Sequence, residues 1–454
     1  MIYILIKKGE KQMKRFVSPL NLLYFALVSF VANAYILVKI SPWFLFLIVP
    51  IFLYLNLFAG VLTSETKRLR LRICYHGGVL LGAFALSLLV SVLYHAILLL
   101  VTYDTDLMTF AISVIWCVFV SAYIFWNGIL CVYLTSKHLG VKWRILGALC
   151  GVVPVVNIIT LGIVVDIVMD EIEHEIELER IERNGEKERC KTKYPILFVH
   201  GVFFRDSKHF NYWGRIPRAL KARGATVYYG EHQSALAVAD SAHELAARIR
   251  YILDRYGCEK VNIIAHSKGG LDCRYAISEF GIAPHVASIT TINTPHRGCL
   301  FADRLLSLAP EKLKKYVSTA YNVTLRDLGD EDPDFMAAVT DLTAAECQKR
   351  NEKLTFPDGI YAQSVGSILK KWHTGQFPLN LSYHYVKMYD GPNDGLVGEG
   401  SFEWGEKYTL VDVVEGKHGV SHGDVIDFTR ADVPGFDVLE FYADLVEDLK
   451  NRGL

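Results

Sequence analysis

Ser267 stands in a short stretch whose composition suits a reactive serine. The letters AHSKGG at residues 265–270 follow an apolar run at 260–265 and precede a helix-compatible stretch at 271–279. Small residues two positions on either side of a serine permit a strained turn between a strand and a helix, from which the hydroxyl projects. The usual pattern is G-x-S-x-G. Ala265 replaces its first glycine, and a methyl group is small enough for the turn. A serine that only caps the helix is the alternative, but the strand, turn and helix setting favours a nucleophile.

Asp394 is the predicted acid partner of this serine. A serine hydroxyl is a poor nucleophile until a histidine removes its proton, and that histidine needs a carboxylate to hold its tautomer. Asp394 lies in NDGLV, residues 393–397, a turn-rich stretch that follows a strand-like segment at 383–388. Asp390 and Asp412 flank it in the sequence and remain rivals for the role.

His422 is the predicted base. It stands in SHGDV, residues 421–425, after the serine and the acid in the chain, an order that known triads of this type use. His418 lies four residues earlier and is also followed by glycine. Spacing alone favours His422 only slightly.

Alternating strand and helix patterns position these residues. Short apolar runs typical of buried strands occur at 194–199, 225–229 and 260–265, and helix patterns at 216–223 and 242–256 lie between them. Such alternation predicts an α/β fold with a parallel sheet, whose ligands bind beyond the carboxyl ends of the strands.

Five ordered motifs of the region 194–449 resemble those of the bacterial triacylglycerol lipases. The resemblance implies an α/β-hydrolase fold, with a mostly parallel sheet flanked by helices, for a soluble domain at 194–454. The matching motifs are VHG at 199–201, YWGRIP at 212–217 with GA at 224–225 and VY at 227–228, AHSKGG at 265–270, TPHRG at 294–298 and NDGLV at 393–397.

The resemblance also implies roles for individual residues. The aspartate of the family's NDGLV stretch is the triad acid, which corresponds to Asp394. The family's histidine is followed two residues later by an acidic residue and then an apolar one, as His422 is by Asp424 and Val425 and His418 is not. The family's oxyanion hole uses two main-chain amides, which correspond to those of Val202 and Lys268.

Other family features are implied less completely. His296 of the TPHRG stretch corresponds to a structural residue and not to a second base. Many of these lipases bind structural calcium through two aspartates, one equivalent to Asp424, but Thr374 stands where the second is expected, so no metal is predicted. An insertion at about 304–382 resembles the family's lid, and an ordinary helical cap without gating is its alternative.

The first third of the chain has the composition of a membrane domain, predicted at 1–168. A bilayer span needs about 20 mostly apolar residues, and five segments qualify, although four or six spans also fit. The polar exceptions within them are interpreted as interhelical hydrogen-bonding groups, with a transport path as the alternative. The segments are 20–38, 43–62, 77–101, 107–134 and 145–165, and the polar exceptions are Asn56, His95, Asn127 and Asn157.

Charged residues predict the topology. Lys and Arg precede the first span between Lys7 and Arg15, and they also follow the second and fourth spans, whereas the alternate loops hold Lys39 alone or the acidic pair Asp104 and Asp106. Because cytoplasmic loops are enriched in Lys and Arg, the N-terminus is predicted inside. Five spans would then place the C-terminal domain outside the cytoplasm of a bacterial cell. A charged helical stalk at 169–193, broken near Gly185, would connect the two.

Together these features predict a membrane-anchored serine carboxylic-ester hydrolase that acts on acylglycerols or related lipid esters. No cofactor is required for this chemistry. The net charge of zero excludes a typical nucleic-acid-binding protein, and the nine cysteines form no C-x-x-C pair. The alternatives are an acyltransferase or thioesterase with the same triad, or a transport or sensing protein whose hydrolase domain is regulatory.

Overall fold

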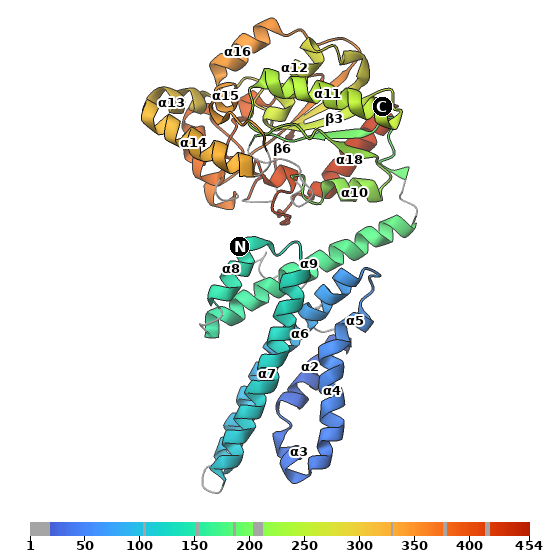
Figure 1. Cartoon of the computed structure of the whole chain (residues 1–454), viewed down its shortest axis with the longest axis vertical. Helices are drawn as coiled ribbons and strands as arrows, with labels where there is room; N and C mark the ends of the chain where they lie inside the picture. The colour runs from blue at the N-terminus through green and yellow to red at the C-terminus, as the bar shows by residue number, and fades with distance from the viewer. Residues whose placement is uncertain are drawn as a thin grey trace. The chain divides into compact units, whose positions relative to one another are not determined.

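The structure is a computed structural model that describes residues 19–102, 106–150, 154–184, 188–202, 212–327, 330–375, 379–413 and 418–454. The chain divides into two units, Met1–Arg180 and Ile181–Leu454. The first unit is helical and the second is built on a parallel sheet (Figure 1). The basic residues from Lys7 to Arg15, the acidic Asp104 and the break at Gly185, all used in the predicted topology, lie outside the described residues.

Helices make up the first unit as the structure describes it. The longest are α6, α9 and α7, with 34, 31 and 29 residues, and of these α6 and α7 correspond to the third and fourth predicted spans. The helices are α2 (Pro19–Ala32), α3 (Tyr35–Ile40), the 3-10 helix η1 (Pro42–Phe44), α4 (Leu45–Leu57), α5 (Ala59–Thr63), α6 (Leu69–Thr102), α7 (Leu107–Thr135), α8 (Gly140–Cys150) and α9 (Pro154–Asn184).

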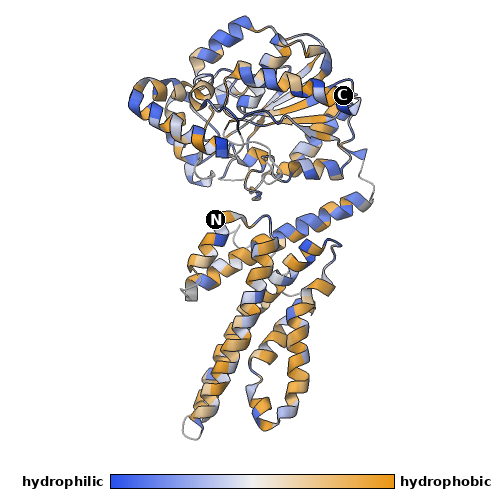
Figure 2. Cartoon of the chain, viewed as in Figure 1, coloured by the Kyte–Doolittle hydropathy of each residue, from blue (hydrophilic) through white to orange (hydrophobic). Residues whose placement is uncertain are grey.

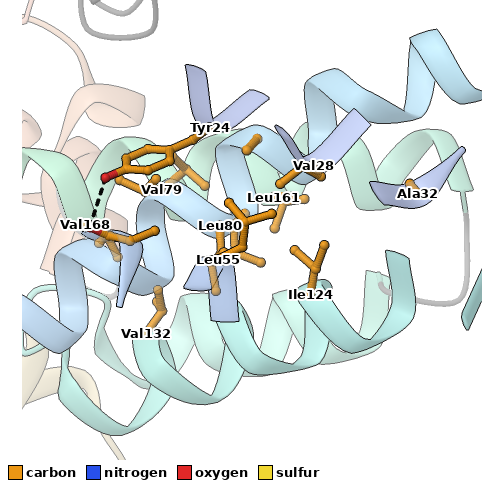
Figure 3. Packing of buried hydrophobic residues seen from close by; sticks show 14 of the residues in the cluster. Tyr24, Val28, Ala32, Leu55, Val79, Leu80, Ile124, Val132, Leu161 and Val168 are labelled. Atoms are coloured by element: carbon orange, nitrogen blue, oxygen red, sulfur yellow. Dashed lines mark hydrogen bonds between the residues drawn. The ribbon is translucent and has the colours of Figure 1, made fainter. Parts of the chain in front are cut away.

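The core of this unit is made by apolar side chains of α2, α4, α6, α7 and α9. One residue from each helix illustrates this core, and each is at most 1% exposed: Val28, Leu55, Leu80, Ile124 and Val168 (Figure 3). The core also contains a polar contact. The hydroxyl of Tyr24 on α2 donates to the main-chain carbonyl oxygen of Ala59 on α5 at 2.9 Å (Figure 3).

Helices α6 and α7 also have apolar outer faces (Figure 2). By length and composition, α6 and α7 are the two helices among the described residues that could cross a membrane. Only 11% and 28% of their most apolar windows are buried, and Leu100 and Leu134, for example, are 82% and 81% exposed. Apolar surface on this scale is unusual on a water-soluble domain.

The other predicted spans are not single long helices. The first is divided into α2 and α3 at Asn33, whose side-chain amide donates to the carbonyl oxygen of Ser29 at 2.7 Å in the last turn of α2. The second is divided between α4 and α5. The fifth falls on α8 and α9, which are separated by residues 151–153 outside the described residues.

Polar side chains of the predicted spans make hydrogen bonds between helices. The Asn127 side-chain amide of α7 donates to the carbonyl oxygen of Asn56 on α4 at 2.8 Å. The His95 ring of α6 lies 3.1 Å from the hydroxyl of Ser113 on α7. These contacts agree with a packing role for the three predicted residues that they involve.

The charged segment after the fifth predicted span is helical. α9 runs without a break from its apolar first half into a hydrophilic second half (Figure 2). Glu171 in this helix is fully buried, and it accepts hydrogen bonds from Arg70 at 2.7 Å and from the hydroxyl of Ser136 at 2.6 Å. The carboxylate thus joins α9 to the start of α6 and to the end of α7.

Six parallel strands form the sheet of the second unit, in the order β2-β1-β3-β4-β5-β6. Val199 pairs with Ala265, and His266 pairs with Ile292, so β1, β3 and β4 end at the same edge. The strands are β1 (Ile196–Val199), β2 (Val227–Tyr229), β3 (Val261–His266), β4 (Val286–Ile292), β5 (Tyr361–Ser367) and β6 (Lys407–Val411).

Helices cover both faces of this sheet (Figure 1). On one face of the sheet, Ile196 and Phe198 of β1 pack with α10 and α18 in one apolar cluster. On the other face, Leu197 and Val199 pack with α11 and α12 in a second cluster. The near-continuous apolar strands follow from burial on both faces. The helices are α10 (Ile216–Ala222), α11 (Val238–Tyr256), α12 (Lys268–Glu279), α13 (Leu300–Leu308), α14 (Glu311–Asp327), α15 (Phe335–Thr340), α16 (Ala344–Lys353), α17 (Tyr383–Asp390) and α18 (Val438–Asn451), with 3-10 turns at Ala283–His285, Trp372–Thr374, Leu379–Ser382, Glu399–Ser401 and Asp424–Ile426.

Two local predictions need correction. The strand-like segment at 383–388 is helix α17, in which the buried residues Tyr383 and Val386 are three positions apart, the spacing of one helix face. The insertion predicted at 304–382 is not all cap, because Tyr361–Ser367 is strand β5 of the sheet, between β4 and β6. Helices α13 to α16 precede that strand.

Candidate active site

Ser267 occupies a strained turn between β3 and α12. Its φ and ψ angles are 54° and −130°, in a region that L residues rarely adopt. The main-chain N–H of Ser267 donates to the carbonyl oxygen of Ile292 at 2.9 Å, which fixes the turn against β4. The serine is half-buried, as a nucleophile that must meet a substrate would be.

Two glycines let the loop after β1 approach this turn closely. A Cβ atom on Gly269 would lie 2.3 Å from the carbonyl oxygen of His200. A Cβ atom on Gly201 would lie 2.8 Å from the Cβ atom of Ser267. The small residues in the VHG and AHSKGG motifs therefore bring the β1 loop and the serine turn into contact.

Asp394 and His422 lie together beside this turn. The Nδ1 atom of His422 is 2.6 Å from the Oδ2 atom of Asp394, and the main-chain N–H of His422 donates to the carbonyl oxygen of Asp394 at 2.9 Å. The other carboxylate oxygen accepts the main-chain N–H groups of Leu396 and Val397, each at 2.8 Å. Asp394 is fully buried, so these donors offset the cost of removing a carboxylate from water.

The rival residues have other partners. The carboxylate of Asp390 accepts the N–H groups of Leu300 and Phe301 at the start of α13, both at 2.9 Å. Asp412 pairs with Lys370. The ring of His418 lies 3.0 Å from the carbonyl oxygen of the next residue, Gly419.

His266 connects the serine turn to His422. The ring of His266 packs against the ring of His422 with 4.4 Å between centroids. The hydroxyl of Tyr212 accepts the N–H of Gly201 at 3.2 Å and lies 2.6 Å from Nδ1 of His266. Burial, together with the neighbouring His422, holds the pKa of His266 well below its usual value, so this ring stays neutral. Ser267 follows His266 directly in the chain.

No hydrogen bond joins Ser267 to His422 within the described part of the chain. In structures without substrate such bonds are often long and tighten only when substrate binds.

One predicted oxyanion donor directly follows Ser267, and the other belongs to the β1 loop that contacts the serine turn. Lys268 is the first residue of α12, so its N–H has no acceptor within the helix. Val202 follows Gly201 in the β1 loop and is buried in a small cluster with Leu325 of α14 and Ala338 of α15. The positive end of the α12 dipole, at Lys268, would also stabilise a negative oxygen beside this N–H.

The side chain of Lys268 forms a buried ion pair that the sequence did not reveal. Lys268 and Asp272 are each 1% exposed, and the ammonium donates to Asp272 at 2.7 Å and to the hydroxyl of Ser241 at 2.9 Å. Burial raises the pKa of Asp272 to about 6, although Lys268 acts in the opposite direction. His232 lies 3.8 Å from the same carboxylate and stacks on His200 at 4.0 Å. The spacing of four residues between Lys268 and Asp272 in a helix-compatible stretch was the signal in the sequence that could have predicted this ion pair.

Asn293 is a second residue that the sequence analysis missed. Its side-chain amide donates to Oδ2 of Asp394 at 2.7 Å. It directly precedes the TPHRG motif, but a single asparagine there gave no sign of a contact with a residue about 100 positions later.

His296 has the contacts of a structural residue. Its ring lies 3.0 Å from the guanidinium of Arg274 and 2.9 Å from the hydroxyl of Thr291. Burial and the neighbouring arginines hold its pKa well below the usual value.

Thr374 and Asp424, at the two positions of the family's calcium site, both make hydrogen bonds within the protein. Thr374 donates from its hydroxyl to the carbonyl oxygen of His418 at 2.6 Å. Asp424 accepts the N–H and the hydroxyl of Ser421 at 3.0 and 2.6 Å, beside His422. In the described ranges no group of three His, Cys, Asp or Glu side chains could hold a metal ion.

Comparisons with known proteins find relatives of this chain. The family described as having the alpha/beta hydrolase fold matches residues 194–373. A triacylglycerol lipase of Pseudarthrobacter phenanthrenivorans is 35% identical over 173 residues, 35% of this chain and 53% of that protein. Triacylglycerol lipase 2 of Saccharomyces cerevisiae is 30% identical over 269 residues, 55% of this chain and 77% of that protein. Among solved structures, the mature Bacillus licheniformis lipase BlEst2 is 23% identical, with a TM-score of 0.41, over 56% of this chain and 92% of that chain.

The extent of these matches differs between relatives. The chain spans about half the length of the first two curated relatives, 53% and 48%. All of these matches leave much of the chain uncovered, since the largest shares of it named above are 55% and 56%.

Proposed function

Because the chain belongs to the lipase and esterase family of the α/β hydrolases, we propose that it is a serine carboxylic-ester hydrolase with the triad Ser267, Asp394 and His422. The observation that carries the proposal is the 2.6 Å contact of His422 with the buried Asp394, next to a serine held in a strained turn. A carboxylate in this place holds the imidazole in the tautomer that can accept a proton at Nε2.

The proposed mechanism uses these groups in turn. Nε2 of His422 removes the proton of the Ser267 hydroxyl while the oxygen attacks the ester carbonyl. The N–H groups of Val202 and Lys268 stabilise the negative oxygen of the tetrahedral intermediate, typically by about 3 to 4 kcal/mol for each donor. His422 then protonates the leaving alcohol, and a water molecule, activated by the same imidazole, releases the carboxylic acid from the acyl-enzyme.

The proposed substrates are acylglycerols or related lipid esters. The named relatives are triacylglycerol lipases, and an enzyme held at a membrane would meet esters of fatty acids there. No cofactor takes part in the proposed reaction.

The test of this function is hydrolysis of p-nitrophenyl esters with chains of increasing length by the full-length protein in detergent. Release of p-nitrophenol with a preference for longer chains is the expected result. Hydrolysis in ¹⁸O-labelled water should put one labelled oxygen into the released acid, whereas an acyltransferase would give a labelled acid only as a minor product beside a new ester. A folded protein that cleaves none of the esters would refute the proposal.

We further propose that the first unit anchors the enzyme in a bacterial membrane, with the division 1–168 membrane domain, 169–193 stalk and 194–454 hydrolase. The exposed apolar faces of α6 and α7 support it, as does a boundary between units that falls inside the stalk, at Arg180 and Ile181. Five spans would put the N-terminus inside and the hydrolase outside the cytoplasm.

A protease added to intact cells should then degrade the hydrolase unit. A tag at the C-terminus should be lost while a tag at the N-terminus is protected. Protection of both tags until the cells are broken would place the hydrolase in the cytoplasm and contradict the five-span topology. Release of the protein by a carbonate wash would contradict the anchor itself.

A further inference from the structure

Asn293 is a buried side chain that the mechanism above does not use, although it touches the proposed acid. It follows β4 directly, and its main-chain N–H donates to the carbonyl oxygen of Val365 on β5 at 2.8 Å. Its side-chain amide donates to Oδ2 of Asp394 and to the hydroxyl oxygen of Ser367, both at 2.7 Å. Asn293 and Ser367 are fully buried.

The backbone of Asn293 is also unusual. Its φ is 47°, a left-handed value that non-glycine residues rarely adopt and asparagine adopts more readily than most. A residue held there in a buried position costs folding free energy, so the surrounding contacts must hold it in place. This conformation is what turns the amide from the end of β4 toward Asp394.

The amide orientation follows from its partners. The nitrogen has two hydrogens, and the acceptors Asp394 and Ser367 account for both. A reversed amide would place its oxygen against the carboxylate of Asp394, which has no hydrogen to share. The side-chain oxygen of Asn293 has no hydrogen-bond partner among the described residues. The side chain is therefore held by its two N–H donors and not by its oxygen.

Oδ2 of Asp394 therefore receives two donors, Asn293 and His422, while Oδ1 receives two main-chain N–H groups. All four donors are neutral while His422 is the base, and together they hold a single negative charge. A carboxylate fixed in this way offers His422 one lone pair in one direction. Without Asn293, the carboxylate could rotate and Oδ2 would lose half of its donors.

We propose that Asn293 is a positioning residue of the active site, which fixes the Asp394 carboxylate and through it the orientation and proton affinity of His422. The inference rests on the proposed function, since it requires Asp394 and His422 to act as acid and base. Asn293 acts through Asp394, so it should affect the chemical step and leave substrate binding nearly unchanged.

Two substitutions in the full-length protein test this role. Asn293→Gly keeps a residue that accepts a positive φ and removes the donor. It should lower kcat about 10- to 100-fold, as expected for loss of a hydrogen bond to a charged group, with KM within about 2-fold of the wild type. Ser367→Ala is the matched control because it removes the other 2.7 Å bond of the same amide without touching Asp394. It should retain most of kcat.

Asn293→Asp has nearly the same shape and puts a second buried carboxyl 2.7 Å from Asp394. Two carboxyls this close share one proton, because like charges at this distance cannot both ionise near neutral pH. The protonated carboxyl donates to Asp394 as the amide does, and loss of its proton at higher pH removes that donor. The kcat of Asn293→Asp should therefore fall with rising pH in a range where the wild type is constant, and Ser367→Ala should not show this fall. A role in folding alone would lower stability and would not add this pH dependence.

The outcomes separate the two proposals. If the wild type hydrolyses esters, and Asn293→Gly keeps wild-type kcat or Asn293→Asp keeps the pH profile of the wild type, Asn293 has no positioning role. If Asn293→Gly does not fold, the pH profile of Asn293→Asp decides alone. If the wild type is inactive on every ester, the proposed function fails first, independently of Asn293.

Discussion

Ser267→Ala should lower kcat for ester hydrolysis by about 10⁴- to 10⁶-fold, the range seen when the nucleophile of a serine hydrolase is removed. Without the hydroxyl no acyl-enzyme can form, and only the oxyanion donors and substrate binding contribute. The fold should persist, because alanine is smaller than serine and the turn is anchored by main-chain bonds such as Ser267 N–H to Ile292. Initial rates with a p-nitrophenyl ester measure the effect.

Ser288→Ala is the matched control for this substitution. Ser288 is a fully buried serine of β4, and its hydroxyl donates to Asn262 near the start of β3, at the opposite end of that strand from Ser267. It should keep activity within a few-fold of the wild type. A fluorophosphonate probe should label the wild type and Ser288→Ala but not Ser267→Ala. Wild-type rates in Ser267→Ala would assign the nucleophile elsewhere. A biological role that survives this substitution would favour the transport or sensing alternative.

His422→Ala and His418→Ala should differ by about 10⁴-fold or more in kcat. The two histidines are four residues apart and both precede glycine, but only His422 reaches Asp394, at 2.6 Å, while His418 lies against the carbonyl oxygen of its neighbour. His418→Ala should stay within about 3-fold of the wild type, and each variant serves as the control of the other. Equal losses in the two variants, with melting temperatures near that of the wild type, would contradict the assignment of the base.

Local patterns predicted the elements near Ser267 well. The strand at 260–265 and the helix after the serine correspond to β3 and α12, because a buried apolar run, a glycine-rich turn and helix-compatible residues are all signals within one short stretch. The same holds for β1, β2, α10 and α11. The α/β fold class is therefore confirmed from patterns that need no knowledge of distant contacts.

Distant contacts could not be predicted from spacing. The choice of Asp394 over Asp390 depends on which loop meets His422, and Asn293 reaches Asp394 only because β4 and the loop after α17 lie at the same edge of the sheet. The segment 383–388 was wrong as a strand because its aromatic residues favour strands locally, while burial of one face in the fold selects a helix. The i and i+4 spacing of Lys268 and Asp272 allowed an ion pair, but it did not reveal that the pair is buried.

The order of the chain also decides when the protein can first act during its synthesis. Ribosomes deliver the helices of the first unit before any strand of the sheet, and domains fold in that order. His422 is made long after Ser267, so a nascent chain has the proposed nucleophile before the proposed base. The proposed reaction can begin only when the segments with Asp394 and His422 dock beside β3 and β4. If the apolar helices insert as they emerge, the growing chain cannot cleave the lipids that receive it.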